Sequence, residues 1–201
     1  MQSLDVLKSI ILNLKLYEGN FLMVRHRSSK NWRQINDSNV SKINNLEQGL
    51  IFENYDTIAI KGKEILNLSS KKISDLATDE SPLISIASIV ELNDTIFHIP
   101  LMNLHLDEQI ELSVLVEIIN KFTKNKFWIM KTDRYFHIYV NDMLGSIEWL
   151  EWNLRYLMSS FLVSPRYIAQ SLQRNYNLLR LNATDNYKVI VPYCIYEKGE
   201  L

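Results

Sequence analysis

The fold prediction rests on residues 126–139, which read Lys126-Phe-Trp-Ile-Met-Lys-Thr-Asp-Arg-Tyr-Phe-His-Ile-Tyr139. Two short apolar runs, rich in aromatic residues and Ile, flank a polar turn at residues 131–134. Runs of this composition favour β-strands, and a short polar connection favours a hairpin. The sequence therefore predicts two neighbouring strands, with the turn residues and His137 close together at one end of a sheet.

This end of the sheet is a candidate anion site. A histidine beside two cations, Lys131 and Arg134, and a hydroxyl, Thr132, suits a phosphate better than it suits a hydrolytic triad. The alternative is a structural histidine in the core that bonds to a backbone carbonyl.

Four segments carry a resemblance to a known family. Thr132-Asp-Arg-Tyr-Phe-His-Ile-Tyr139 resembles the second motif of the archaeo-eukaryotic primase superfamily, a short turn followed by a histidine on a strand. Ile99-Pro-Leu-Met-Asn-Leu-His-Leu-Asp107 is similar to the strand of the first motif, which normally carries two metal-binding acids one residue apart. Residues 163–181 resemble the third-motif region, and Lys188-Val-Ile-Val-Pro192 resembles the end of the core. The order and spacing agree over residues 95–195.

The chain departs from the family at the metal-binding acids. Asn103 and His105 stand at the two acid positions of the first motif, and Ser164 stands at that of the third. Carboxylates are needed to neutralise and hold Mg²⁺ or Mn²⁺. Asp107 is the candidate metal ligand that remains on this face of the strand, unless it caps the helix that follows. The alternative is that these polar residues only form hydrogen bonds, or that the true acids are Asp94 and Asp133, which do not lie at the family spacing.

The resemblance implies a nucleotide-binding cleft. Its candidate residues are Lys131, Thr132, Arg134, His137, Arg166, Arg180 and Lys188. Arg180 lies in an apolar segment, so its guanidinium needs an anion or a carbonyl group as a partner. That partner is either a ligand phosphate or a carboxylate of the protein such as Asp133.

The chain has 201 residues, of which 47% are hydrophobic and 22% charged, a composition typical of one soluble globular domain. We expect a smaller N-terminal segment at 1–68 and a primase-like core at 83–196. No apolar run reaches the roughly 18 residues of a membrane helix, and the N-terminus lacks a signal pattern, so the predicted location is cytoplasmic. The single cysteine, Cys194, excludes an internal disulfide and a cysteine-based zinc site.

Charge is unevenly distributed, although the net charge is −1. Residues 1–120 carry a net charge of −5 and residues 121–188 a net charge of +5. The basic half is therefore expected to bind nucleotides or nucleic acid, the alternative being a solvated surface that binds nothing. Cations also surround Trp32, which either stacks on bases or caps the core.

Strands and helices in mixed order predict an α+β fold with helices against a mostly antiparallel sheet. The expected helices span residues 3–16, 40–55, 108–122 and 146–160, and a short one starts near Pro165. The other expected strands span residues 21–25, 57–60, 83–90, 176–181 and 187–195, with one or two within 95–106. We expect the strands at 176–181 and 187–195 to pair as a hairpin, and residues 66–83 to form a long surface loop.

The sequence also predicts N-cap residues for two of these helices and the buried face of one. Ser3 and Ser146 are the expected N-caps of the first and last long helices. The expected apolar face of the helix at 146–160 comprises Ile147, Leu150, Leu154, Leu157, Met158 and Phe161. Trp149 and Trp152 are expected to serve packing.

The resemblance implies a primase-polymerase-like protein that binds nucleotides or nucleic acid in DNA replication or a mobile element. A helicase is a possible partner, and Mg²⁺ or Mn²⁺ a possible cofactor. Because the expected acids are replaced, we predict weak or lost nucleotidyltransferase activity. One alternative is a non-catalytic accessory or regulatory subunit that docks a protein partner. Another is an unrelated α+β domain, in which the motif segments would not converge on one cleft.

Overall fold

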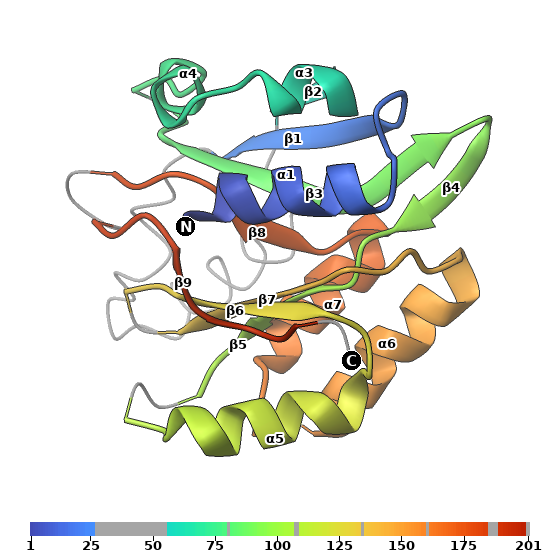
Figure 1. Cartoon of the computed structure of the whole chain (residues 1–201), viewed down its shortest axis with the longest axis vertical. Helices are drawn as coiled ribbons and strands as arrows, with labels where there is room; N and C mark the ends of the chain where they lie inside the picture. Colours follow the sequence, from blue (N-terminus) through green and yellow to red (C-terminus); the bar gives the residue numbers. More distant parts are fainter. Residues whose placement is uncertain are drawn as a thin grey trace, which may run out of the picture.

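The computed structural model describes residues 1–26, 56–79, 81–106, 109–133, 135–159, 161–184 and 189–199. The predicted helix at 40–55 and the segment around Trp32 lie outside the described residues. Within them, Figure 1 shows two sheets stacked one above the other, with helices on both sides of the lower one. The predicted α+β class is confirmed.

The first sheet has the strand order β2-β1-β3-β4, and β8 also pairs with β3. Its strands are β1 (Asn20–His26), β2 (Asp56–Lys61), β3 (Leu83–Leu92), β4 (Thr95–His98) and β8 (Leu178–Arg180). The second sheet has the order β5-β7-β6-β9. Its strands are β5 (Leu101–Leu104), β6 (Phe127–Lys131), β7 (Phe136–Val140) and β9 (Tyr193–Glu197). All these pairings are antiparallel, and the predicted hairpin is β6–β7.

The helices divide between the two sheets. They are α1 (Ser3–Asn13), α3 (Gly62–Leu66), α4 (Ser70–Asp75), α5 (Leu112–Phe122), α6 (Ser146–Met158) and α7 (Pro165–Arg174). One core cluster joins α1, the first sheet and the inner face of the second sheet, including Trp128 and Tyr139. A second cluster lies under the other face of the second sheet, where α5, α6 and α7 pack. Alternation along β7 divides its side chains between these two cores.

The predicted hairpin at 176–195 is wrong, because its two strands lie in different sheets. β8 pairs with β3, through Leu178 opposite Ala87, and β9 pairs with β6, through Cys194 opposite Met130. Strands adjacent in sequence often pair, but apolar pattern alone does not select the partner. Here the buried side chains of β8 complete the first sheet, and β9 covers the edge of the hairpin.

The predicted loop at 66–83 contains a helix, α4. The Ser69 hydroxyl accepts a hydrogen bond from the Lys72 backbone N–H, 3.2 Å, and so caps the first turn. Ile73 anchors this helix in the core. The segment is mostly polar, so its composition did not predict this helix, which packs on the core through a single buried residue, Ile73.

Both predicted N-caps are displaced by one residue. Gln2 precedes α1, and its backbone N–H donates to the Asp5 carboxylate, 2.8 Å. Gly145 precedes α6, and its N–H donates to Glu148, 2.8 Å. In each helix the acid at the third position, rather than a serine, satisfies the free N–H group.

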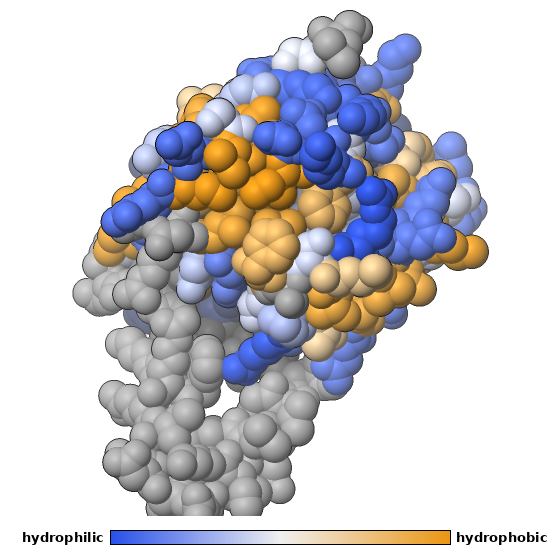
Figure 2. Space-filling model, turned by 90° about the horizontal axis from the view of Figure 1, so that it is seen from below, coloured by the Kyte–Doolittle hydropathy of each residue, from blue (hydrophilic) through white to orange (hydrophobic). Residues whose placement is uncertain are grey.

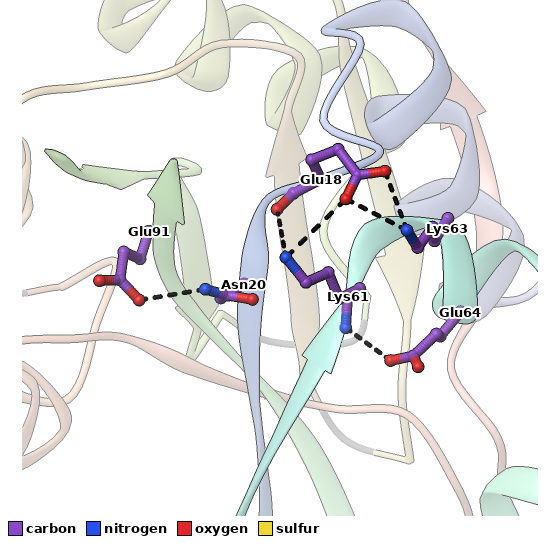
Figure 3. A network of polar contacts seen from close by, with 6 residues as sticks. All are labelled: Glu18, Asn20, Lys61, Lys63, Glu64 and Glu91. Atoms are coloured by element: carbon purple, nitrogen blue, oxygen red, sulfur yellow. Dashed lines mark hydrogen bonds and ion pairs between the residues drawn. The ribbon is translucent and has the colours of Figure 1, made fainter. Parts of the chain in front are cut away.

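The connection between α1 and β1 is fixed to the β2–α3 junction by a surface network (Figure 3). The Glu18 carboxylate lies 3.8 Å from the Lys61 ammonium and 3.0 Å from the Lys63 ammonium, and the latter lowers the pKa of Glu18. Gly62 is required at this junction because a Cβ there would lie 2.0 Å from the Leu16 carbonyl oxygen. Contacts between residues 16–18 and 61–63 therefore fix how the first sheet meets α1.

α6 is oriented opposite to its predicted apolar face. It buries Trp149, Trp152, Asn153 and Tyr156, so the predicted packing role of the two tryptophans is confirmed. Of the predicted face, Leu157 packs against the second core cluster, whereas five residues are exposed: Ile147, Leu150, Leu154, Met158 and, just after the helix, Phe161. The face of α6 that packs inward is the one that carries the aromatic rings and Asn153, not the one that carries most of the aliphatic side chains.

A buried polar network explains why an asparagine lies inside. Asn177 Oδ1 accepts from Trp149 Nε1, 2.6 Å, and from Asn153 Nδ2, 3.3 Å, while Asn177 Nδ2 donates to Asn153 Oδ1, 2.8 Å. The Asn177 backbone N–H donates to Ser88 Oγ, 3.0 Å, which also lies 3.3 Å from His98 Nδ1. This network joins α6 to β3 and to the segment before β8.

The buried histidine of this network predicts a pH dependence. Burial lowers the pKa of His98 to about 4 from 6.5, and burial with the nearby Arg174 charge lowers that of His26 to about 4. Below pH 6.5 the unfolded chain therefore takes up protons that the folded chain refuses until about pH 4. We expect the free energy of unfolding to be highest above this window and to fall as pH drops through it, by up to about 3 kcal/mol for His98.

Urea unfolding at pH 7.5, 5.5 and 4.5 measures this dependence. His98→Phe keeps a ring against Trp149, where the two rings stack at 4.5 Å, but cannot titrate. Its stability should fall less steeply between pH 6.5 and 4 than that of the wild type. Equal slopes in the two proteins would contradict the assignment.

Candidate functional site

Asn103 and His137 lie side by side on the second sheet. They are direct partners in the β5–β7 register, so their side chains share one face. Leu101 and Tyr139, two residues away on the same strands, belong to the core between the sheets, so this is the face that looks toward the first sheet. His137 is buried. Alternation thus places the first-motif residue Asn103 beside the second-motif residue His137.

His105 joins this pair at the end of β5. Its ring stacks on Tyr135 at 4.0 Å between centroids, and Asn103 Nδ2 lies 3.5 Å from its Nε2. Its backbone N–H donates to the Leu162 carbonyl, 2.8 Å, in the connection between α6 and α7. Ser164, which precedes α7, follows two residues later. The positions that resemble the primase acids therefore converge on the end of β5.

The β6–β7 turn is closed by its own threonine. Thr132 Oγ1 donates to the Tyr135 carbonyl, 2.8 Å, and accepts from the Tyr135 N–H, 3.1 Å. The Lys131 ammonium lies 4.6 Å from the centre of the Phe136 ring. Thr132 thus holds the shape of the turn that presents the neighbouring side chains.

Arg180 connects the turn to the first sheet. Its Nη2 lies 2.9 Å from Asp133 Oδ2, and its Nη1 donates to the carbonyls of Asn182, 2.6 Å, and Ile190, 2.7 Å. Asp133 Oδ1 accepts the Ile190 N–H, 2.9 Å. The Arg180 side chain is only 8% exposed, and its anionic partner is the carboxylate that the sequence offered as the alternative to a phosphate. Arg180 therefore joins the end of β8, the β6–β7 turn and the segment before β9.

The other candidate residues lie less centrally or outside the described residues. Arg166 is exposed in the first turn of α7. Arg134, Lys188 and Asp107 lie outside the described residues. The excess of positive charge over 121–188 is partly offset by acids elsewhere in the chain. Those ion pairs are Lys121–Glu117, 3.7 Å, and Lys126–Glu197, 2.8 Å.

The described residues do not match the donor set of a divalent metal site. Over the described ranges, no group of three or more His, Cys, Asp and Glu is placed to hold a metal ion. Asn103 and His105 offer neutral donors, whereas Mg²⁺ and Mn²⁺ sites depend on carboxylates. We therefore derive no catalytic step through a metal.

Two contributors were not found from the sequence. Tyr135 supplies the ring that stacks on His105, and its only signal was an aromatic residue directly after the turn. Asn182 accepts from the Ile84 N–H, 2.8 Å, and donates to the Pro82 carbonyl, 2.9 Å, and so ties the end of β8 to the start of β3. No sequence pattern pointed to this second role.

Comparison with known families agrees with the geometry. A family model described as AEP-like, archaeo-eukaryotic primase 1D-like, matches residues 65–193. The chain belongs to this AEP-like family. The match spans the two motif strands, the β6–β7 turn and β8, so the alternative of an unrelated α+β domain is excluded. No curated protein and no solved structure matches the chain. Among the described helices, none is long and apolar enough to cross a membrane.

Proposed function

We propose that this AEP-like chain binds nucleotides or single-stranded nucleic acid beside the β6–β7 turn, around His137. The observation that carries the proposal is the family match over residues 65–193, which includes all three convergent segments. Histidine and basic side chains next to a fixed turn suit phosphate oxygens. Arg166, exposed in the first turn of α7, and Lys131, at the turn end of β6 on the face opposite His137, are the described cations that we assign to phosphate contacts.

We further propose that this chain alone has weak or no nucleotidyltransferase activity. Asn103, His105 and Ser164 stand where the primase acids are expected, and none of them supplies the negative charge that two-metal catalysis requires. The same replacement supports a second candidate, a non-catalytic accessory subunit that holds nucleic acid for a partner such as a helicase. DNA replication or a mobile element is the setting we propose for either.

The test is a titration of the full chain with a fluorescent single-stranded DNA and with a nucleoside triphosphate, each with and without Mn²⁺. Lys131→Gln and Arg166→Gln should each weaken binding by roughly threefold to tenfold. For the DNA, the slope of log K against log salt concentration should become shallower by about 0.7 for each phosphate contact removed. Lys71→Gln is the matched control, because it removes the same charge from an exposed position on α4.

The outcomes separate the two parts of the proposal. Equal weakening by all three variants, or no binding of either ligand, would contradict the assigned site. Binding that does not change with Mn²⁺ supports a site without the metal pair. Primer extension by the wild-type chain in Mn²⁺ above a no-protein background would overturn the loss of activity and leave the binding site standing.

A further inference from the structure

The outer face of α6 is an exposed apolar stripe. Five side chains form it: Ile147, Leu150, Leu154, Met158 and Phe161. Each is between 41% and 87% exposed. Figure 2, which views the molecule from the α5 side, shows broad apolar areas on that side of the molecule. We name these five residues the α6 stripe.

The stripe lies opposite the side of α6 that is already packed. At about 100° per residue, Leu150, Leu154 and Met158 project away from Trp152 and Tyr156, which the core covers. A helix that is apolar on both sides is expected to be buried on both sides. The second side of α6 therefore needs a cover that one copy of the described chain does not provide.

The size of the stripe suits a protein interface. Taking about 200 Å² for each large apolar side chain, the stripe exposes on the order of 600 Å². This equals the upper range for the largest apolar patch of a typical monomer, roughly 300–600 Å². It also approaches the roughly 800 Å² that each partner buries in a stable interface.

The spacing of the stripe is symmetric about its centre. Leu150 and Met158 lie four residues on either side of Leu154, and Ile147 and Phe161 lie seven residues on either side. If two α6 helices cross antiparallel at Leu154, Leu150 meets the partner subunit's Met158, and Ile147 approaches the partner subunit's Phe161. A twofold interface requires a surface that is complementary to itself in this way.

The charges beside the stripe select the antiparallel orientation. Glu148 and Glu151 lie in the first half of α6 and Arg155 in the second half, all exposed and on the same flank. Arg155 is held there by a hydrogen bond to the Lys121 carbonyl, 3.2 Å. In an antiparallel pair this flank meets its own copy with the halves exchanged, so Glu151 faces the partner subunit's Arg155. In a parallel twofold pair this flank would face the other flank of the partner helix, so the pairing of Glu151 with Arg155 would be lost.

We propose that the chain forms a twofold dimer in which the α6 stripes of two copies pack antiparallel about Leu154. The flank charges make a lipid surface the poorer fit, since two acids beside the stripe oppose binding to anionic headgroups. The dimer is independent of nucleotide binding, because the stripe lies on α6, and the proposed ligand contacts lie on β6 and α7.

Sedimentation velocity and light scattering on the full chain, from about 1 to 100 μM, test the dimer. The wild type should reach twice the chain mass of 23.6 kDa. Leu154→Glu places two like charges at the twofold axis and should raise the dissociation constant at least 100-fold. Leu12→Glu, at an exposed apolar position on α1, is the matched control and should leave the dimer intact.

Charge exchange tests the antiparallel arrangement. Glu151→Arg should weaken the dimer about tenfold, and adding Arg155→Glu should restore it. Leu154→Cys should give a disulfide-linked dimer on mild oxidation, while Leu12→Cys should not, which keeps the test valid if Leu154→Glu fails to fold.

Three results would overturn the proposal. The first is a wild-type chain that stays monomeric at 100 μM. Binding of this monomer to vesicles of anionic lipid would show that the stripe contacts a membrane instead. The second is a dimer that survives Leu154→Glu, and the third is a charge exchange that does not rescue.

Discussion

Replacement of Arg180 by Met is expected to lower the free energy of unfolding by about 3–5 kcal/mol. The substitution leaves the Asp133 carboxylate, 16% exposed, without its 2.9 Å partner. It also removes the donors to the Asn182 and Ile190 carbonyls. Removing only Arg180 leaves a buried charge without its partner, and this costs more than removing both charges of the pair. Urea unfolding followed by circular dichroism at pH 7.5 measures the change.

A surface ion pair supplies the control. Lys126→Met breaks the 2.8 Å contact with Glu197, whose side chain is 44% exposed, and should cost less than about 1 kcal/mol. Combining Arg180→Met with Asp133→Asn should recover part of the loss, because the buried charge is then removed as well. A cost for Arg180→Met no larger than that of Lys126→Met would show that the buried pair does not hold the turn.

Because of this structural role, Arg180 is a poor probe of the ligand site. An Arg180 variant that binds nucleotide weakly could do so because the β6–β7 turn has moved, since the guanidinium joins that turn to β8 and to the segment before β9. Lys131 and Arg166 are better probes. Their substitution leaves this ion pair in place.

Local pattern was sufficient for the strands that carry the site and insufficient for their partners. The two apolar runs that flank a polar turn in residues 126–139 predicted the β6–β7 hairpin and put His137 at one end of the sheet. Two-residue periodicity placed Asn103 and His105 on one face of a strand. Apolar runs of this kind could not distinguish the pairing of β8 with β3 from a hairpin with β9. That choice depends on contacts between residues distant in sequence, such as Ser85 opposite Arg180.

The face of α6 shows a second limit. Aliphatic periodicity favoured Leu150 and Leu154 as buried residues, and a buried Asn153 contradicts any hydropathy rule. Asn153 is tolerated inside because Asn177, on a different element, satisfies its amide. The partner exists only once the chain has folded, so the sequence alone could not reveal it. The apolar residues left outside are then available for an intermolecular contact.

Replacement of Asn177 by Ala should destabilise the protein by about 3–4 kcal/mol. The substitution removes the acceptor of Trp149 Nε1 and the donor to Asn153 Oδ1, both in the buried core, while Asn153 Nδ2 keeps its bond to the Trp149 carbonyl, 2.8 Å. Trp149 Nε1 and Asn153 Oδ1 then lie in the core without the partners that offset desolvation, and a cavity adds to the cost. Urea unfolding at pH 7.5, where His98 is neutral in both states, isolates this effect.

Asn67→Ala is the matched control, because Asn67 is exposed and its amide donates to the Lys63 carbonyl, 3.0 Å. It should cost less than about 1 kcal/mol. In a double-mutant cycle, Asn153→Ala and Asn177→Ala should together cost less than the two separate losses added, by about 1–2 kcal/mol, since each removes the other's partner. Simple additivity would mean that the two amides stabilise the α6 contact independently, and a small cost for Asn177→Ala would mean that water replaces the network.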